Sequence, residues 1–219
     1  MLPEQYETYV KMVAETREAW HGRVDVRLGL ESDYYPGVES WLEELHGRVP
    51  LHHVLGSVHP HLKDYRKLYD PGTAFGYRQV YFEHLAQAAE TGMYDTLAHP
   101  DLIKNEDPAT WDFSRILPFI ERSLDRIAAT GVAMELNTGP FNKSVPKTYP
   151  GLDQLKLMRE RDIPVVLGAD AHEPKRVASY YPEALRLLQE AGYDSVSLFL
   201  DRQRQDIPIP TALASLRVS

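Results

Sequence analysis

Hydrophobic and polar residues alternate along this chain with two periodicities, one typical of helices and the other of strands. Apolar residues recur among charged ones in segments that favour helices: 3–20, 38–47, 78–91, 113–130, 151–161 and 182–192. Short β-branched or alternating runs, bounded by glycine, proline or polar residues, predict strands at 24–31, 53–59, 94–101, 132–137, 164–172 and 195–200. A polar segment with Pro60, Pro71 and Gly72 is predicted to be a loop. No linker or low-complexity segment divides the pattern, so we expect one domain over residues 1–219.

The predicted strands end on polar residues at fairly regular intervals. These ends fall at residues 31, 59, 99, 135 and 170, which are 28, 40, 36 and 35 residues apart. A strand, a helix and two loops take roughly 30 residues or more, so the spacing predicts repeated βα units and a parallel sheet. Such units can close into a barrel or form an open doubly wound sheet. The recurrence of polar strand ends favours the barrel, because its carboxyl strand ends meet at one rim.

Metal-ligating side chains would gather at that rim. The candidates are Glu31, His59, His99, Glu135, Asn137, Asp170 and His172. Asp170 and His172 are two residues apart, so on a strand they would point to the same face, beside the small residues around them. A carboxylate and an imidazole that converge suit a divalent cation such as zinc or manganese.

Each candidate also has a structural interpretation. Asp170 could cap a helix, Asp33 could replace Glu31, and Asp101 could cap the helix that follows His99. His59 lies near other histidines, at positions 52, 53 and 61, and strand parity favours His59. His21, His46 and His84 lie in helical or loop contexts and are expected at the surface.

Composition narrows the chemistry further. The chain has 219 residues, 43% of them hydrophobic, which is enough for one substantial core. Its net charge of −8, without a run of Lys or Arg, argues against a nucleic-acid partner. There is no cysteine, so a metal must be held by His, Asp and Glu, a donor set that suggests a multinuclear hydrolytic centre. The absence of a membrane-span pattern or a signal-peptide core predicts a cytoplasmic protein.

Five motifs carry a resemblance to a known family. They are GLESDY at 29–34, GSVH at 56–59, HPDLIK at 99–104, ELNT at 135–138 and GADAH at 168–172. In order and spacing they resemble the PHP (polymerase and histidinol phosphatase) superfamily, and within it the histidinol-phosphate phosphatases. The resemblance implies a distorted (β/α)7 barrel of TIM type whose trinuclear centre of zinc, manganese or iron hydrolyses L-histidinol phosphate. It implies that Glu31 bridges two metals, that His59 and His99 complete the second metal's ligands, that Asp170 binds the first metal and that His172 binds the third.

The chain departs from the family at its start. The family's first strand ends in His-x-His and its second in Asp-His, and neither motif is present here. We therefore expect a barrel that lacks its first two βα units, from an N-terminally shortened gene model or expressed fragment. For a chain that truly begins at Met1, we expect at most one well-held metal and little turnover.

Two lysines are candidates for contacts to the substrate. Lys104 and Lys143 lie on predicted βα loops and could bind phosphate oxygens, or could be solvated surface lysines. Asp101, Glu135 and Asn137 are expected to support the ligands. The sequence thus predicts a phosphatase for a small phosphomonoester, with no indication of oligomeric state. Alternatives are another PHP hydrolase, such as a phosphotyrosine phosphatase or a nuclease, and a non-catalytic remnant that binds metal.

Overall fold

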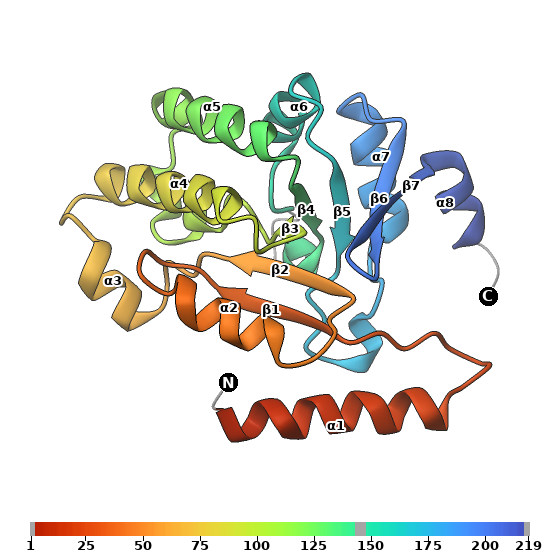
Figure 1. Ribbon diagram of the computed structural model, residues 1–219. Helices are drawn as coiled ribbons and strands as arrows, with labels where there is room; N and C mark the ends of the chain where they lie inside the picture. The colour runs from red at the N-terminus through yellow and green to blue at the C-terminus, as the bar shows by residue number, and fades with distance from the viewer. Residues whose placement is uncertain (1–2, 143–147, 217–219) are drawn as a thin grey trace.

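The protein is a mixed α/β structure built on one seven-stranded sheet (Figure 1). The computed structural model describes residues 3–142 and 148–216. The strands are β1 (Gly29–Asp33), β2 (His53–Ser57), β3 (Thr96–Leu97), β4 (Ala133–Asn137), β5 (Val165–Gly168), β6 (Ser195–Leu200) and β7 (Gln203–Pro208). The α-helices are α1 (Pro3–Ala19), α2 (Glu39–Gly47), α3 (Lys63–Tyr69), α4 (Ala74–Glu90), α5 (Phe113–Thr130), α6 (Leu152–Glu160), α7 (Tyr181–Glu190) and α8 (Ile209–Ser215).

The strands lie in the sheet in the order in which they occur in the chain. Each of β1 to β6 runs parallel to its neighbour, and β7 is added antiparallel to β6. A doubly wound sheet would reverse its order at a switch point, so the sequential order argues against that alternative. Within the described residues no ladder joins the two edge strands, β1 and β7. The parallel sheet predicted from the sequence is confirmed.

The helices form for reasons that can be read from their ends and their buried faces. In α5, the Asp112 side chain accepts the N–H of Arg115 at the start, and Gly131 ends the helix in the left-handed conformation. Its buried residues recur every three or four positions: Ile116, Ile120, Leu124 and Ile127. This apolar face packs against α4, and α4 in turn packs against β2 and β3 (Figure 1).

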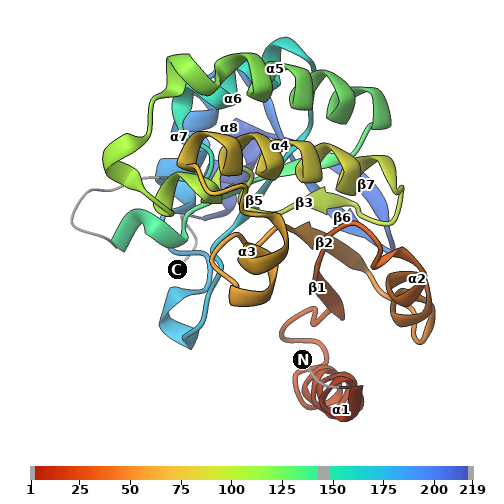
Figure 2. The same ribbon diagram turned by 90° about the vertical axis from the view of Figure 1, so that its left-hand side faces the viewer.

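Helix α1 lies along the free edge of β1 (Figure 2). The Tyr9 hydroxyl donates to the Gly29 carbonyl at 2.7 Å, and Arg17 donates to the Val26 carbonyl at 2.9 Å. Tyr6 is buried in the same packing. The bond from Tyr9 satisfies one carbonyl of β1, and covering an edge strand in this way limits its pairing with another chain.

The β6–β7 hairpin reaches back to the start of β2. Its two-residue loop, Asp201 and Arg202, has φ values of +52° and +62°, which is the backbone of a type I′ turn. The backbone N–H of Arg202 donates to the His52 carbonyl at 3.0 Å, and Phe199 stacks on His53 with ring centroids 5.1 Å apart. Thus β2 and β6, which are not neighbours in the sheet, are in contact through side chains.

Several sequence predictions need correction. Helix α3, strand β7 and helix α8 were not predicted, and the strand predicted at 94–101 is reduced to Thr96–Leu97. Strand β5 ends at Gly168, so Asp170 and His172 lie in the following loop, and Asp170 has a φ of +46° that no strand allows. His84, predicted at the surface, is buried and bonded to the Tyr65 hydroxyl at 2.7 Å. Within the described residues, no helix has both the length and the apolarity to cross a membrane.

Candidate metal centre

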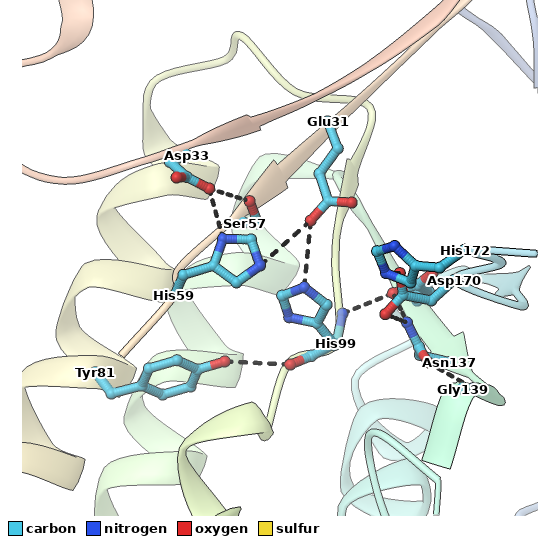
Figure 3. Close-up of polar contacts among 11 residues, drawn as sticks. Glu31, Asp33, Ser57, His59, Tyr81, His99, Asn137, Gly139, Asp170 and His172 are labelled. Atoms are coloured by element: carbon cyan, nitrogen blue, oxygen red, sulfur yellow. Dashed lines mark hydrogen bonds and ion pairs between the residues drawn. The ribbon is translucent and has the colours of Figure 1, made fainter. Parts of the chain in front are cut away.

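Three side chains from successive βα units converge at the carboxyl ends of the strands (Figure 3). Glu31 is on β1, and His59 and His99 each follow a strand by two residues, β2 and β3 respectively. One potential ligand atom from each residue lies within 4.8 Å of the other two. Glu31 Oε1 is 3.6 Å from His59 Nε2 and 3.2 Å from His99 Nε2. The structure therefore brings together residues that are 28 and 40 positions apart in sequence.

The spacing of these atoms suits a divalent cation. Nitrogen and oxygen ligands about 2.0–2.2 Å from a tetrahedral zinc ion lie roughly 3.3–3.6 Å from each other. The two separations from Glu31 Oε1, 3.2 and 3.6 Å, bracket this range. Two imidazoles and a carboxylate are also ligands that zinc accepts, so the residues present fit such an ion.

Opposite charges within the cluster stabilise the ionised forms of Glu31 and His99. Burial alone would raise the pKa of Glu31, but the hydrogen bond with His99 and the nearby imidazoles hold that pKa below its ordinary value. Burial alone would lower the pKa of His99, but the contact with Glu31 and the charge of Glu135 raise it above its ordinary value. A cation bound among these groups would replace the charge of the imidazolium.

His59 and His99 are positioned in different ways. His59 is held through its side chain, because Nδ1 lies 2.5 Å from Asp33 Oδ1. His99 is held through its backbone: its N–H donates to Glu135 Oε2 at 2.7 Å, and its carbonyl accepts the Tyr81 hydroxyl at 3.2 Å. These two bonds support a backbone with a φ of +29°. Within the described residues, Nδ1 of His99 is buried without a hydrogen-bond partner.

Glu135 lies on β4, next to the backbone of His99. It is buried, and besides the His99 N–H it accepts the side-chain amide of Asn137 at 3.1 Å. Burial raises the pKa of its carboxyl group to about 7. Glu135 and Asn137 were predicted to support the ligands, and these contacts are compatible with that role.

Asp170 and His172 lie beside the cluster and outside the group of three. Asn137 Nδ2 donates to Asp170 Oδ2 at 3.4 Å, and the charge of Asp170 contributes to the raised pKa of His99. His172 Nε2 is 3.1 Å from Asp170 Oδ1, and the His172 side chain is 89% exposed. The two side chains are thus in contact with each other, but they lie in a loop and not, as predicted, on one face of a strand.

A cavity of about 420 Å³ adjoins Asp170 and His172. Its wall includes Tyr149, His61, Glu106 and Arg176, and Arg176 also donates to the Gly139 carbonyl at 2.8 Å. This volume is within the usual range for a small-molecule site.

The two lysines predicted to bind phosphate have different outcomes. Lys104 is outside the cavity lining, and its ammonium donates to Asp101 Oδ2 at 2.8 Å and to the Thr148 carbonyl at 2.6 Å. Asp101 is buried and also accepts the Gly151 N–H at 3.1 Å, so this pair ties together two loops. Lys143 lies outside the described residues.

Sequence reasoning did not identify three residues of this region. Arg176 lines the cavity, Tyr81 supports His99, and Ser57 holds Asp33. Asp33 was considered only as a replacement for Glu31, whereas the structure shows it bonded to His59. The position of Asp33, two residues after Glu31 on one strand, was the available signal. No comparable signal marks Arg176 or Tyr81.

Comparisons of sequence and of structure with known proteins find proteins of the same name. No family model matches the chain. A Deinococcus radiodurans protein named probable histidinol-phosphatase is 32% identical over 212 residues, covering 92% of this chain and 78% of that protein. The structure of histidinol phosphate phosphatase from Lactococcus lactis, solved with zinc, L-histidinol and phosphate, matches with a TM-score of 0.73 at 16% identity, covering 91% of this chain and 79% of that one. The structure of a Listeria monocytogenes protein named putative histidinol phosphatase matches with a TM-score of 0.71 at 18% identity. The match covers 84% of this chain and 77% of that one.

Proposed function

This chain belongs to the histidinol-phosphatase family, and we propose that it hydrolyses L-histidinol phosphate to L-histidinol and phosphate with a divalent cation. The observation that carries the proposal is the convergence of Glu31, His59 and His99, with ligand atoms 3.2 and 3.6 Å apart. In the reaction the phosphorus–oxygen ester bond breaks, the oxygen of water joins phosphorus, and the released alcohol oxygen takes a proton. The fold supports this proposal, because the cluster lies at the carboxyl ends of parallel strands.

Glu31, His59 and His99 would hold the cation, and Asp170 and His172 would extend the site toward the cavity. A divalent cation supplies two things when bound: a nucleophile at neutral pH, by lowering the pKa of water, and compensation of phosphoryl charge. Zinc is the metal we favour, because the donor set and spacing suit it. We extend the proposal to manganese or iron, and to further ions near Asp170 and His172 up to the family's three.

The phosphate and the organic part of the substrate would occupy the adjoining cavity. Arg176 in its wall can attract a phosphate through a guanidinium, whose paired N–H groups match phosphate oxygens. Lys104 already donates to two acceptors, so a phosphate there would have to compete with Asp101. Because Arg176 lines the cavity and Lys104 does not, we infer that Arg176 binds the phosphate, and we keep Lys104 and Lys143 as further candidates.

We also infer that the sheet is a distorted barrel of the PHP type, left open between β1 and β7. The sequential strand order and the contacts of the β6–β7 hairpin with His52 and His53 support this architecture.

Phosphate release after chelation and reloading tests the function. The protein is stripped with a chelator, reloaded with Zn²⁺ or Mn²⁺, and assayed with L-histidinol phosphate and with phosphotyrosine. We expect metal-dependent release from histidinol phosphate that His59→Ala and His99→Ala abolish and that His21→Ala, at an exposed histidine, leaves unchanged. Faster release from phosphotyrosine would favour another PHP hydrolase. No release from either substrate, at full metal loading, would favour a non-catalytic protein.

A further inference from the structure

The imidazole of His59 lies between two carboxylates of one strand (Figure 3). Glu31 and Asp33 are two residues apart on β1, so their side chains leave the same face of the sheet. His59 Nδ1 is 2.5 Å from Asp33 Oδ1, and Nε2 is 3.6 Å from Glu31 Oε1. The first separation is that of a strong hydrogen bond, whereas the second is too long for one. The two carboxylates therefore play different parts.

Asp33 determines which ring nitrogen carries the proton. An ionised carboxylate only accepts hydrogen bonds, so the ring nitrogen that faces it must be the donor. In a neutral imidazole with its proton on Nδ1, the lone pair is on Nε2. Nε2 is the atom that faces Glu31 and the centre of the cluster. The contact thus gives His59 the tautomer that a metal ligand needs.

The Asp33 carboxylate is itself fixed by the sheet. Asp33 on β1 is the register partner of Ser57 on β2. The Ser57 hydroxyl donates to Asp33 Oδ1 at 2.9 Å, the same oxygen that faces His59. Because Ser57 precedes His59 by two residues, the segment that carries the imidazole also binds the partner of that imidazole, Asp33. The chain from Ser57 through Asp33 to His59 is therefore built into the β1–β2 ladder.

His99 lacks such a partner among the described residues, since its Nδ1 is buried without a hydrogen bond. Its ring orientation depends on the backbone bonds to Glu135 and Tyr81. Of the two imidazoles, His59 is thus the one whose outer nitrogen is fixed by a carboxylate, the arrangement that orients ligating histidines in metal proteins.

We propose that Asp33 is a positioning residue of the metal centre, which fixes the tautomer and ring orientation of His59 without binding the cation itself. This inference rests on the cation-binding part of the proposed function. Loss of such an outer partner typically weakens metal binding 10- to 100-fold.

Zinc affinity, measured by competition with a chromophoric chelator, tests the proposal. We expect Asp33→Asn and Asp33→Ala to weaken zinc binding about 10- to 100-fold, and His59→Ala to weaken it further. Asp64→Asn is the matched control, because Asp64 is an exposed acid that lines the same cavity of about 320 Å³ as Asp33 and His59. Its zinc affinity should equal that of the unsubstituted protein. Circular dichroism melting of each variant checks that the fold is retained.

A second readout needs no metal and no substrate. In the chelator-treated protein, ¹⁵N chemical shifts should show His59 protonated on Nδ1. In Asp33→Ala this preference should be lost, while His21 stays unchanged.

The outcomes separate this proposal from the proposed function. Zinc binding by Asp33→Asn and Asp33→Ala as tight as in the unsubstituted protein, or a proton on Nε2 and none on Nδ1 of His59 in that protein, would overturn the role of Asp33 alone. Weakened zinc binding in these variants, together with no hydrolysis of histidinol phosphate by the loaded unsubstituted protein, would support Asp33 and overturn the phosphatase proposal. Absence of zinc binding by the unsubstituted protein would overturn both.

Discussion

The carboxylate of Glu135 occupies the space where a β-carbon would stand at Gly168. A β-carbon built on Gly168 would lie 1.6 Å from Glu135 Oε1 and 2.6 Å from its carboxyl carbon. The two residues lie on neighbouring strands, β4 and β5, in a register that pairs Glu135 with Val166 and Asn137 with Gly168. Only glycine at position 168 leaves room for the carboxylate that accepts the His99 N–H.

Substitution of Gly168 should therefore affect both stability and metal binding. In Gly168→Ala the carboxylate must move and its bond to the His99 N–H is lost, so we expect the free energy of unfolding to fall by about 2–3 kcal/mol. Zinc affinity should fall as well, because His99 loses a backbone support. Denaturant unfolding and zinc titration measure the two effects. Gly151→Ala is the control, since nothing lies within 4 Å of a β-carbon there and its φ of −74° suits alanine. Equal stability of the two variants would contradict the close packing.

The sequence predicted the fold where periodic patterns are long and local. Helices such as α5 at 113–130 and α7 near 182–192 were located closely, because each has an apolar face and clear ends. The β6–β7 hairpin was not predicted, because Asp201 and Arg202 are not the Asn-Gly or Asp-Gly pair typical of its turn. Helix α3 has seven residues between two prolines, too few for a periodic pattern.

The convergence of Glu31, His59 and His99 was predictable from the sequence, whereas the contacts that hold them in place were not. Recurring strand ends were enough to nominate Glu31, His59 and His99, because parallel strands must end on the same side. What Asp33 and Tyr81 do depends on side-chain directions and on contacts between elements distant in sequence, which a linear pattern does not contain. The same holds for His84, whose burial follows from the packing of α4 against α3, and not from its own neighbours in sequence.

His84 should make stability depend on pH. Burial lowers the pKa of this imidazole from 6.5 to about 4. Between these values the unfolded chain binds more protons at this site than the folded chain, so the free energy of unfolding rises with pH and falls on acidification from about 6.5 to 4. A shift of this size corresponds to about 3 kcal/mol.

Urea unfolding at several pH values, compared between the unsubstituted protein and His84→Gln, isolates this contribution. The variant should lose the part of the pH dependence between pH 4 and 6.5, whatever its absolute stability. His21→Gln is the matched control at an exposed histidine and should retain the full dependence. A His84→Gln curve parallel to that of the unsubstituted protein would show that His84 is not neutral and buried.

Arg202 should stabilise the protein although its backbone conformation favours glycine. Its guanidinium donates to Asp95 Oδ1 and to the Met93 carbonyl, both at 2.8 Å, and Asp95 is buried. In Arg202→Gly the φ of +62° costs nothing, yet the buried Asp95 carboxylate loses its cationic partner and keeps the Val54 N–H. We expect a net loss of about 1–3 kcal/mol in the free energy of unfolding. Arg204→Ala, which breaks a half-exposed ion pair with Asp206 at 3.3 Å, should cost less than about 1 kcal/mol. A variant Arg202→Gly more stable than the parent would show that the ion pair contributes less than the backbone strain.

The difference in exposure between His99 and His172 predicts which of them contributes more to the affinity of the tightest zinc site. His99 is buried and 3.2 Å from Glu31, whereas His172 is 89% exposed and contacts only the neighbouring Asp170 among the interactions described. Ordering an exposed side chain around a cation costs conformational entropy that a buried ligand has already lost on folding. We therefore expect His99→Ala to weaken the tightest zinc site at least about 100-fold, and His172→Ala less than about 3-fold, in a competition titration. If His172→Ala lost the first zinc ion as completely as His99→Ala, the primary site would have to include the β5–α7 loop, and Glu31, His59 and His99 alone would not define it.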